Sequence, residues 1–333
     1  MNRMISHRRI LIAAACCLLF YSKTSVMIYA VNKENAELTQ MKEEIAGNLK
    51  KTVYYLAEEI GPRSYTQTDA LQKTTDYIKS ALKGYGYEVS VQAYSAKGRT
   101  FENISAVRKG TARPEKLLVV GAHYDTVPGT PGADDNASGV AGLLELARLF
   151  ADEQPGITLH FVAFALEEPP FFRTKQMGSY VYAKKLHDGQ SDVEGMICLE
   201  SMGFFRDSPD SQMFPLPFLR FFYPRTGNYI TFVSDFRSRD FLNRAKTAFR
   251  QGSSLPAESL SSFAIIPGVD FSDHRSFWKF GYKAIMVTDT AFYRNPNYHG
   301  IGDVPATLDY ERLAEVVMGL KASIRELAGA TDR

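Results

Sequence analysis

Cysteine is scarce in this chain of 333 residues. Of the three cysteines, Cys16 and Cys17 lie close to the N-terminus, so Cys198 stands alone in the rest of the sequence. A lone cysteine cannot form an internal disulfide, which excludes a disulfide scaffold for the body of the protein. Glycine and proline are also few, with 24 and 15 residues, and we find no repeat or low-complexity segment. These absences exclude collagen-like and disordered chains.

The composition that remains is that of an ordinary globular protein. Apolar residues make up 45% of the chain and charged residues 23%. A chain of this length can bury most of the surface of its unfolded state without disulfides or other staples. Length alone allows one large α/β domain or two smaller domains.

The chain also lacks an excess of charge of one sign. The formal net charge is +2, but the first 30 residues hold four cations and no acid, so the rest of the chain carries −2. No dense run of Lys and Arg occurs outside the N-terminus. A nucleic-acid-binding surface needs a basic stripe, so we expect no nucleic-acid partner.

The N-terminus has the pattern of an export signal. Three arginines precede an apolar run of 12 residues, 10–21, which is short compared with the roughly 20 residues of a membrane span. A second apolar stretch, 26–31, follows Lys23, so an uncleaved anchor over residues 10–31 stays open. We expect an exported protein, periplasmic or extracellular, with a signal peptide or anchor over residues 1–30 and no other membrane partner.

Residues 31–333 alternate between helix-type and strand-type periodicity. Helical spacing occurs at 35–59, 66–82, 140–152, 177–187, 240–251 and 309–328, and strand patterns occur at 88–94, 117–122, 158–166, 195–199, 229–233 and 284–288. This order predicts a single α/β domain with a mostly parallel mixed sheet flanked by helices, which binds ligands at the carboxyl ends of its strands.

One long stretch, residues 204–227, has no regular periodicity. It is rich in Phe, Pro and Arg. A loop of this length in a compact domain is usually functional or mobile, so two interpretations stay open. The stretch is either a surface excursion packed on its own aromatic residues or a lid that faces a substrate.

Side chains that could bind a metal or take part in catalysis follow the first predicted strands. His123 and Asp125 lie where the strand 117–122 leaves the sheet, and a metal-bound His commonly donates its second N–H to a carboxylate. Asp134 and Asp135 follow in a turn of small residues that opens a helix. Acids at a helix start are also ordinary caps, so neither motif is specific by itself.

The next two strands end in acids. Glu167 and Glu168 follow the strand 158–166 and precede two prolines, where pairing must stop. Adjacent strand residues point to opposite sides, so one carboxylate can bind a metal while the other acts as a general base. Glu200 ends the following apolar strand. A second histidine, His299, lies near the C-terminus with Asp303 shortly after it.

Together these residues resemble the exported co-catalytic di-zinc aminopeptidases, whose relatives include glutamate carboxypeptidase II and glutaminyl cyclase. The resemblance covers residues 117–317 in consistent order, and the combined motif is far more specific than any of its parts. It is carried by the segments 123–125, 132–139, 167–168, 272–274 and 298–299.

The resemblance implies two zinc ions per chain. It implies that His123 and Glu200 each serve one zinc, that Asp135 bridges both, and that Glu168 and His299 complete the two sites. Whether His299 shares its zinc with Glu168 or with Glu200 stays open.

The resemblance also implies the catalytic roles. Glu167 is the implied general base, and Asp125 orients His123. Asp303 could do the same for His299, and Asp134 is structural. The peptide bond after Asp135 is expected to be cis.

The implied activity is that of an aminopeptidase that hydrolyses the N-terminal bond of peptides with a free N-terminus. Three alternatives stay open. A glutaminyl cyclase would use a similar ligand frame with one zinc. A carboxypeptidase would need a cation for the terminal carboxylate, for which Arg173, Arg220 and Arg225 are candidates. A non-catalytic, receptor-like relative would have lost ligands, whereas all five implied ligands and the base are present here.

Two departures from the family pattern matter. The aminopeptidases usually have Asp where Glu200 stands, which leaves the number of bound zinc ions open. In addition, residues 169–176 intervene before the next helix. We expect this insertion to overhang the metals and to shape the substrate pocket.

Other conspicuous residues have plainer interpretations. His160 fits a core or sheet-face histidine, and His187 suits a helix end. His274 could touch substrate or bond to a backbone carbonyl. Tyr293 and Tyr298 flank the implied ligand loop and could line the pocket.

Overall fold

A computed structural model of the protein describes residue 33 and residues 36–329. These residues fall into two compact units that divide between Glu44 and Ile45, and the sheet with its covering helices belongs to the second unit. The predicted signal peptide or anchor, with Cys16 and Cys17, lies outside the described residues. Within the described part of the chain, no helix combines the length and the apolar character that crossing a bilayer requires.

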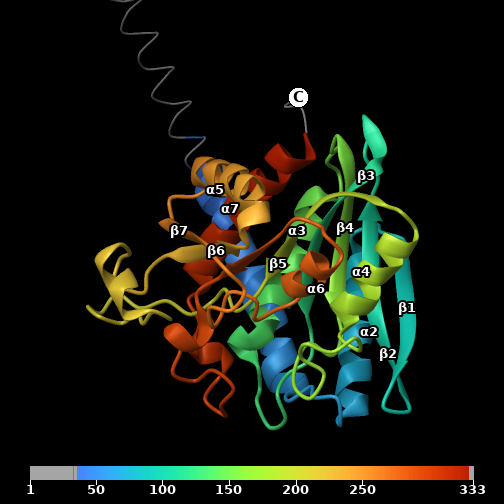
Figure 1. The fold of residues 1–333 in the computed structure, drawn as a ribbon, viewed down its shortest axis with the longest axis horizontal. Coiled ribbons are helices and arrows are strands. Elements are labelled where there is room, and N and C mark those ends of the chain that lie inside the picture. Colours follow the sequence, from blue (N-terminus) through green and yellow to red (C-terminus); the bar gives the residue numbers. More distant parts are fainter. Residues whose placement is uncertain (1–32, 34–35, 330–333) are drawn as a thin grey trace, which may run out of the picture. The chain divides into compact units, whose positions relative to one another are not determined.

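An eight-stranded mixed sheet forms the centre of the second unit (Figure 1). Its strands, in spatial order, are β1 (Val89–Ala96), β2 (Arg99–Arg108), β4 (Ile157–Phe164), β3 (Arg113–His123), β5 (Asp192–Leu199), β8 (Ala284–Thr288), β6 (Ile230–Ser234) and β7 (Ala257–Ser261).

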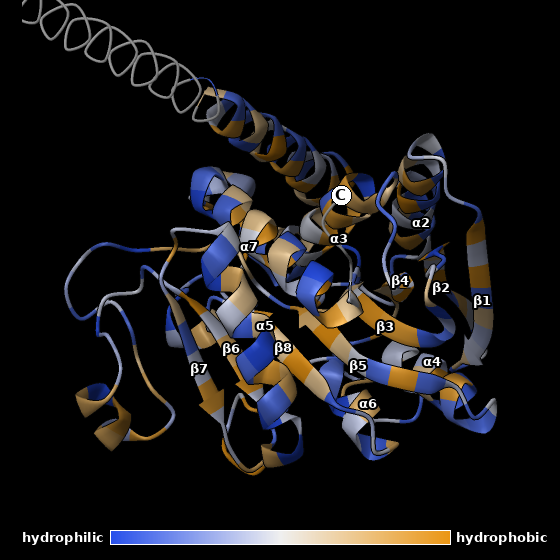
Figure 2. Cartoon of the chain, turned by 90° about the horizontal axis from the view of Figure 1, so that it is seen from above, coloured by the Kyte–Doolittle hydropathy of each residue, from blue (hydrophilic) through white to orange (hydrophobic). Residues whose placement is uncertain are grey.

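The four central strands, β4, β3, β5 and β8, pair in parallel. After the charged first residues of β3 and β5, these strands are almost continuously apolar because helices cover both of their faces, which is typical of parallel sheets. Figure 2 shows this hydrophobic character along β3. The antiparallel pairs lie toward the two sides of the sheet, where β2 joins β1 and β4, and β6 joins β8.

Helices pack on both faces of the sheet (Figure 2). On one face, residues 45–54 are helical and buried side chains come from α2 (Thr68–Gly84), α3 (Gly139–Phe150), α5 (Arg239–Gly252) and α7 (Tyr310–Ala328). The other face is covered by α4 (Gly178–Asp188) and α6 (His274–Lys279). The mixed sheet flanked by helices confirms the predicted fold class.

Short helical turns connect these elements. They are η1 (Tyr55–Ile60), η2 (Ala133–Ser138), η3 (Pro217–Phe221), η4 (Phe236–Ser238), η5 (Ala291–Tyr293) and η6 (Pro305–Thr307). The turn η2 runs directly into α3 and is fully buried.

Two strands were missed by the sequence analysis. Strand β2 contains Glu102 and Asn103 among its apolar residues, which breaks simple alternation, and Asn103 is buried because it bonds to the backbone of Gly178. Strand β7 is short and largely polar because it lies at the edge of the sheet and is only partly covered. In both strands tertiary pairing outweighs local pattern.

Candidate metal centre

The predicted ligands converge at one edge of the sheet. His123 is the last residue of β3, Glu168 follows β4 and Glu200 follows β5. Because these three strands are parallel neighbours, their carboxyl ends meet at the same edge. Asp135 arrives there on η2, and His299 arrives on the loop between β8 and α7.

The first group of possible metal ligands consists of His123, Asp135 and Glu200. Nε2 of His123 lies 3.3 Å from Oδ1 of Asp135 and 3.2 Å from Oε2 of Glu200. The long side chain of Glu200 is held by two hydroxyl groups, since Ser201 donates to Oε1 at 2.9 Å and Ser272 donates to Oε2 at 2.6 Å. A Glu at this position therefore still reaches the group.

The second group consists of Asp135, Glu168 and His299. Nε2 of His299 lies 3.0 Å from Oδ2 of Asp135 and 3.4 Å from Oε2 of Glu168. This settles the pairing that the sequence left open, because His299 lies with Glu168 and not with Glu200. Asp135 offers one carboxylate oxygen to each group, so it is placed to bridge them.

Glu167 lies beside both groups. Its carboxylate, a ring nitrogen of His123 and the carboxylate of Glu168 all lie within 4.8 Å of one another. Burial raises the pKa of Glu167 well above its ordinary value, and the charge of His123, which lowers this pKa, does not offset the shift. The arrangement provides a buried carboxylate that binds a proton readily next to two candidate metal positions.

The protein's own charges do not balance within the cluster. Burial, followed by the charge of Asp135, raises the pKa of Glu168 to about 8. Burial also raises the pKa of Asp135, but the close imidazole groups of His123 and His299 outweigh this effect and lower the pKa below its ordinary range. The pKa of His299 is raised to about 10, since its carboxylate partners outweigh burial. Carboxylates crowded in this way are stabilised by a bound cation.

The donors fit zinc. Oε1 of Glu168 and Nε2 of His299 are buried and make no hydrogen bond within residues 36–329, so each has room for another partner. Imidazole and carboxylate groups are the ligands of hydrolytic zinc sites, and none of the residues in the two groups is a cysteine. A bound zinc ion would supply the missing partner of both atoms.

Asp125 fixes the positions of several of these groups. Its two oxygens accept hydrogen bonds from the backbone N–H groups of Glu167, at 3.0 Å, and Glu168, at 3.1 Å. Nδ1 of His123 lies 3.1 Å from the carbonyl oxygen of Asp125 and 3.5 Å from Oδ1. Asp125 therefore orients the imidazole, as the sequence indicated, and also holds the end of β4.

Asp303 does not orient His299, and that expectation was wrong. Its carboxylate accepts hydrogen bonds from the backbone N–H groups of Asp134, at 2.9 Å, and Asp135, at 3.1 Å. The side chain of Asp134 in turn accepts from Asn295 at 2.9 Å. These contacts support a structural role for Asp134. They also show that Asp303 holds the turn η2, which carries Asp135. Sequence spacing could not reveal this, because the partners of Asp303 are backbone groups.

The turn η2 is tied to the end of β5. The peptide bond between Asp135 and Asn136 is cis, which confirms the prediction. Nδ2 of Asn136 donates to the carbonyl of Leu199 at 2.8 Å, and its Oδ1 accepts from the N–H of Ser201 at 3.2 Å. The segments of Asp135 and Glu200 are thus linked through the side-chain amide of Asn136.

Arg63 is a supporting residue that the sequence analysis missed. Its guanidinium is fully buried and donates to the carbonyls of Pro131 at 2.8 Å, Gly132 at 2.9 Å and Tyr124 at 3.1 Å. These carbonyls belong to the segment between β3 and η2. No pattern in the sequence marks Arg63, since backbone carbonyls occur at every residue.

The other histidines of the described residues lie outside the two ligand groups. Nδ1 of His160 is 2.7 Å from a tyrosine hydroxyl, and His187 packs against a phenylalanine ring at the end of α4. His274 is buried, with Nε2 2.8 Å from the carbonyl of Val269. Of its two interpretations, the backbone contact is therefore the one observed.

A cleft lies over the two ligand groups. Besides the ligands and Glu167, it is lined by Pro169, Phe172, Phe271, Phe292 and Tyr298. The insertion 169–176 therefore reaches the metal cleft, as expected.

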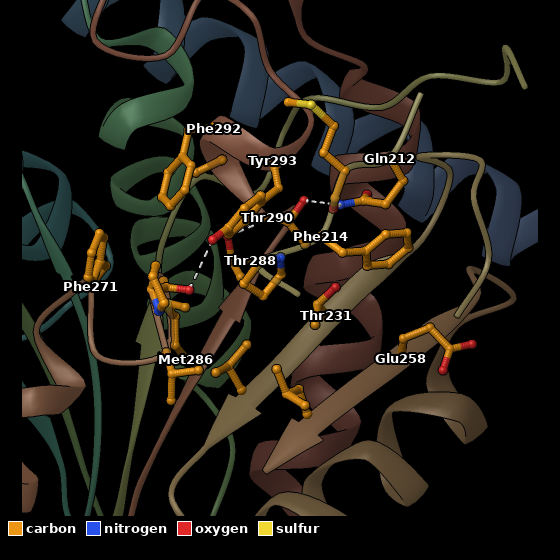
Figure 3. A pocket seen from close by; sticks show the side chains of 18 of the residues that line it. Gln212, Phe214, Thr231, Glu258, Phe271, Met286, Thr288, Thr290, Phe292 and Tyr293 are labelled. Carbon is orange, nitrogen blue, oxygen red and sulfur yellow. Dashed lines mark hydrogen bonds between the residues drawn. The ribbon is translucent and has the colours of Figure 1, made fainter. Parts of the chain in front are cut away.

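An apolar pocket adjoins this cleft and shares Glu200, Phe271, Phe292 and Tyr298 with it. It encloses about 780 Å³, including its open mouth. In Figure 3, Phe271 and Phe292 stand at one end of the pocket and Phe214 and Glu258 toward the other.

The irregular stretch 204–227 faces this pocket. It supplies lining residues from both sides of η3, among them Phe214 and Tyr223. Tyr293 and Tyr298 also line the pocket. Of the two interpretations of the stretch, the structure favours the one in which it faces a substrate.

Two largely buried groups of imidazole and carboxylate side chains that share one carboxylate, with a further carboxylate beside them, are typical of metal-dependent hydrolases. Comparison with known proteins agrees with this class. The model of peptidase family M28 matches residues 103–323. The chain is 41% identical over 280 residues to the uncharacterized protein YfbL of Escherichia coli, across 82% of this chain and 85% of that protein.

Solved structures show the same fold at low identity. BSAP, a zinc aminopeptidase from Bacillus subtilis, has a TM-score of 0.66 and 17% identity, over 84% of this chain and 94% of that one. A glutaminyl cyclase of Bacteroides thetaiotaomicron has a TM-score of 0.62 and 20% identity, over 84% of this chain and 97% of that one.

The chain belongs to peptidase family M28. This confirms the family predicted from the sequence, and with it the enzyme class, a zinc-dependent metallopeptidase.

Proposed function

We propose that the protein is an aminopeptidase that binds two zinc ions and removes the N-terminal residue from peptides with a free N-terminus. The observation that carries the proposal is the shared carboxylate of Asp135, whose oxygens lie 3.3 Å from His123 and 3.0 Å from His299. One oxygen for each group fits two ions better than one.

The ligands divide between the two ions. His123 and Glu200 would hold one zinc, Glu168 and His299 would hold the other, and Asp135 would bridge them. When bound, the two ions supply Lewis acidity, which lowers the pKa of water and polarises the scissile carbonyl.

Glu167 handles the proton. Its carboxylate accepts a proton from the attacking water and delivers it to the leaving amine. Burial raises the pKa of Glu167, and a cation held by the neighbouring ligands would lower it again and favour the carboxylate form that a general base needs. The carboxylate of Asp125 holds both residues in place, since it accepts from the backbone N–H of Glu167 and contacts the ring of His123.

The apolar pocket beside Glu200 is the proposed site for the N-terminal side chain. Its walls are mostly aromatic and aliphatic, which favours a hydrophobic residue in that position. The stretch 204–227 forms part of these walls and would act as the lid.

The decisive experiment combines a zinc count on the purified protein with a substrate panel. Two zinc ions per chain with release of leucine from a leucine anilide are expected. One zinc ion with ammonia release from an N-terminal glutamine would instead identify a glutaminyl cyclase, whose fold this chain shares. Protein that neither binds zinc nor can be reconstituted would point to a receptor-like relative.

We also propose that residues 31–333 form one catalytic domain and that the protein acts in the periplasm or outside the cell. The N-terminal signal pattern supports export. Sequencing the N-terminus of the protein isolated from its producing cell would distinguish a cleaved signal peptide from a retained anchor, and recovery in the cytoplasm would contradict export.

A further inference from the structure

The insertion 169–176 carries an arginine beside the metal cleft. We propose that Arg173 binds a carboxylate of the substrate on the leaving-group side of the scissile bond. This inference rests on the proposed aminopeptidase activity and names a preferred substrate class: dipeptides with a free C-terminus, or peptides with an acidic second residue.

Two aromatic rings hold the guanidinium of Arg173 in place. Its Cζ lies 5.2 Å from the ring centre of Phe172 and 5.1 Å from that of Phe271. Both rings line the cleft over the metal ligands. The guanidinium is thus one ring away from the cleft, and cation–π contacts of this kind restrain an arginine while its N–H donors stay available.

The local charge is not balanced. Asp270 is buried and accepts from Nη2 of Arg173 at 2.5 Å and from Nε of Arg275 at 2.8 Å. One carboxylate therefore pairs with two guanidinium groups, so one of the two positive charges is not neutralised by this pairing. The side chain of Arg173 is 43% exposed, against 19% for Arg275, so Arg173 is the more accessible of the two.

Arg173 also has donors to spare. A guanidinium has five N–H donors, and within residues 36–329 the only side-chain hydrogen bond of Arg173 is the one to Asp270. The fork-shaped group matches a carboxylate in geometry. An accessible cation with spare donors, in contact with two rings that line the cleft, fits an anionic part of the substrate.

The position of the pocket indicates which part of the substrate this is. If the N-terminal side chain fills the apolar pocket beyond Glu200, the residue after the scissile bond would lie in the remaining part of the cleft, which Pro169 and Phe172 of the insertion line. One extended residue spans about 3.3–3.6 Å. In this pose the carboxylate of the second residue would lie near Phe172, whose ring contacts Arg173.

The other two arginines considered in the sequence do not share this position. Arg225 pairs with Asp210, and Arg220 lies over the ring of Phe221. Phe221 is 77% exposed, so Arg220 lies on an outer surface. Neither arginine has a ring contact with a residue that lines the metal cleft, whereas Arg173 contacts Phe172 and Phe271.

The test compares three substrates on the zinc-loaded enzyme: leucyl-glycine, leucyl-glycinamide and leucyl-aspartic acid α-amide. The first carries a terminal carboxylate, the second carries none, and the third carries only a side-chain carboxylate. We expect kcat/KM for at least one carboxylate substrate to exceed that for leucyl-glycinamide by about ten- to a hundredfold, the effect of a charge-assisted hydrogen bond. The substrate that gains identifies the source of the carboxylate.

Arg173→Gln should remove this preference, mainly through a higher KM for the carboxylate substrate, and leave leucyl-glycinamide within about threefold. Arg173→Lys should restore part of the preference because the charge is kept. The matched control is Lys175→Gln, an exposed cation of the same insertion, which should keep the full preference.

Equal rates for all three substrates in the unmodified enzyme would overturn the inference, as would a preference that survives Arg173→Gln. Either result requires that the enzyme cleave leucyl-glycinamide. A protein that cleaves none of the peptides would instead contradict the proposed aminopeptidase activity, so the two failures are distinguishable.

Discussion

At the scale of single residues, the site depends on carboxylates that have different contacts although they occupy similar positions in the fold. Glu167 and Glu168 are adjacent, yet only Glu168 lies within 3.4 Å of His299. Asp125 and Asp303 both accept two backbone N–H groups, and each fixes the segment of a candidate ligand. Their individual substitution should therefore have different consequences.

Glu167→Gln tests the proposed base. The amide can hold a water molecule but cannot accept its proton, so kcat should fall by about 10² to 10⁴ while the zinc content stays unchanged. The measurements are steady-state kinetics and a zinc count on the same sample. Glu115→Gln, an exposed position at the start of β3, is the control. Normal turnover by the Glu167 variant would show that another group acts as base.

Asp125→Asn tests the orienting role. Loss of the carboxylate weakens the contacts to His123 and to the end of β4, so zinc affinity or activity should fall by about 10- to 100-fold. Competition with a chelator of known affinity measures the change. Asp152→Asn, at an exposed position after α3, should bind zinc normally. An unchanged affinity in the Asp125 variant would contradict the assignment.

At the scale of elements, the site is formed where strand ends, one turn and one loop meet. Glycine permits the closest of these approaches. A Cβ built on Gly139, the first residue of α3, would lie 2.2 Å from Oδ1 of Asn136 and 2.6 Å from the carbonyl oxygen of Leu199. This is the point where the turn of Asp135 contacts the end of β5.

Gly139→Ala should therefore separate η2 from β5. We expect the free energy of unfolding to fall by about 1–3 kcal/mol, the usual effect of overpacking, together with weaker zinc binding. Gly84→Ala is the matched control, since Gly84 is helical and its Cβ would meet no atom within 4 Å. Urea denaturation measures the free energy of unfolding of both variants. Equal values would contradict the prediction and show that η2 and β5 move apart at little cost.

At the scale of the whole molecule, the protein without metal contains a buried surplus of acid. Burial raises the pKa of Glu168 to about 8 and, with the charge of Asp134, that of Asp303 to about 8. Burial also raises the pKa of Asp273 to about 7. In the unfolded chain these groups ionise near pH 4. The folded, metal-free protein therefore holds protons that the unfolded chain releases.

The sign of the pH dependence follows from these shifts. The stabilisation by protonated Glu168 is complete below pH 4.5 and is lost as the pH rises toward 8. Chelated protein should thus lose Tm between about pH 5 and 8, by several degrees, because each kcal/mol moves Tm by about 2–4 °C in a large domain. Zinc-loaded protein should show a smaller dependence and a higher Tm at pH 8. A metal-free Tm that rises over this interval would contradict the account.

The sequence identified most of the fold because the central strands carry strong local signals. Continuous apolar runs such as residues 117–122 are typical of strands buried on both faces, and helical periodicity between them indicates the covering helices. Strands β2 and β7 escaped because their polar residues are satisfied by tertiary partners. Asn103 in β2, for example, donates to the carbonyl of Gly178 at 2.8 Å.

By itself, then, the sequence determined the kind of chemistry, because His and carboxylate side chains at strand ends are recognisable from residue type and order. The tertiary structure alone decided how the groups are shared. It placed His299 beside Glu168 and made the carboxylate of Asp303 an acceptor for the backbone N–H of Asp135. It also brought Arg173 against Phe271, a residue of the cleft wall. The physical reason is that these contacts join residues distant along the chain or involve backbone groups, and no local pattern encodes either.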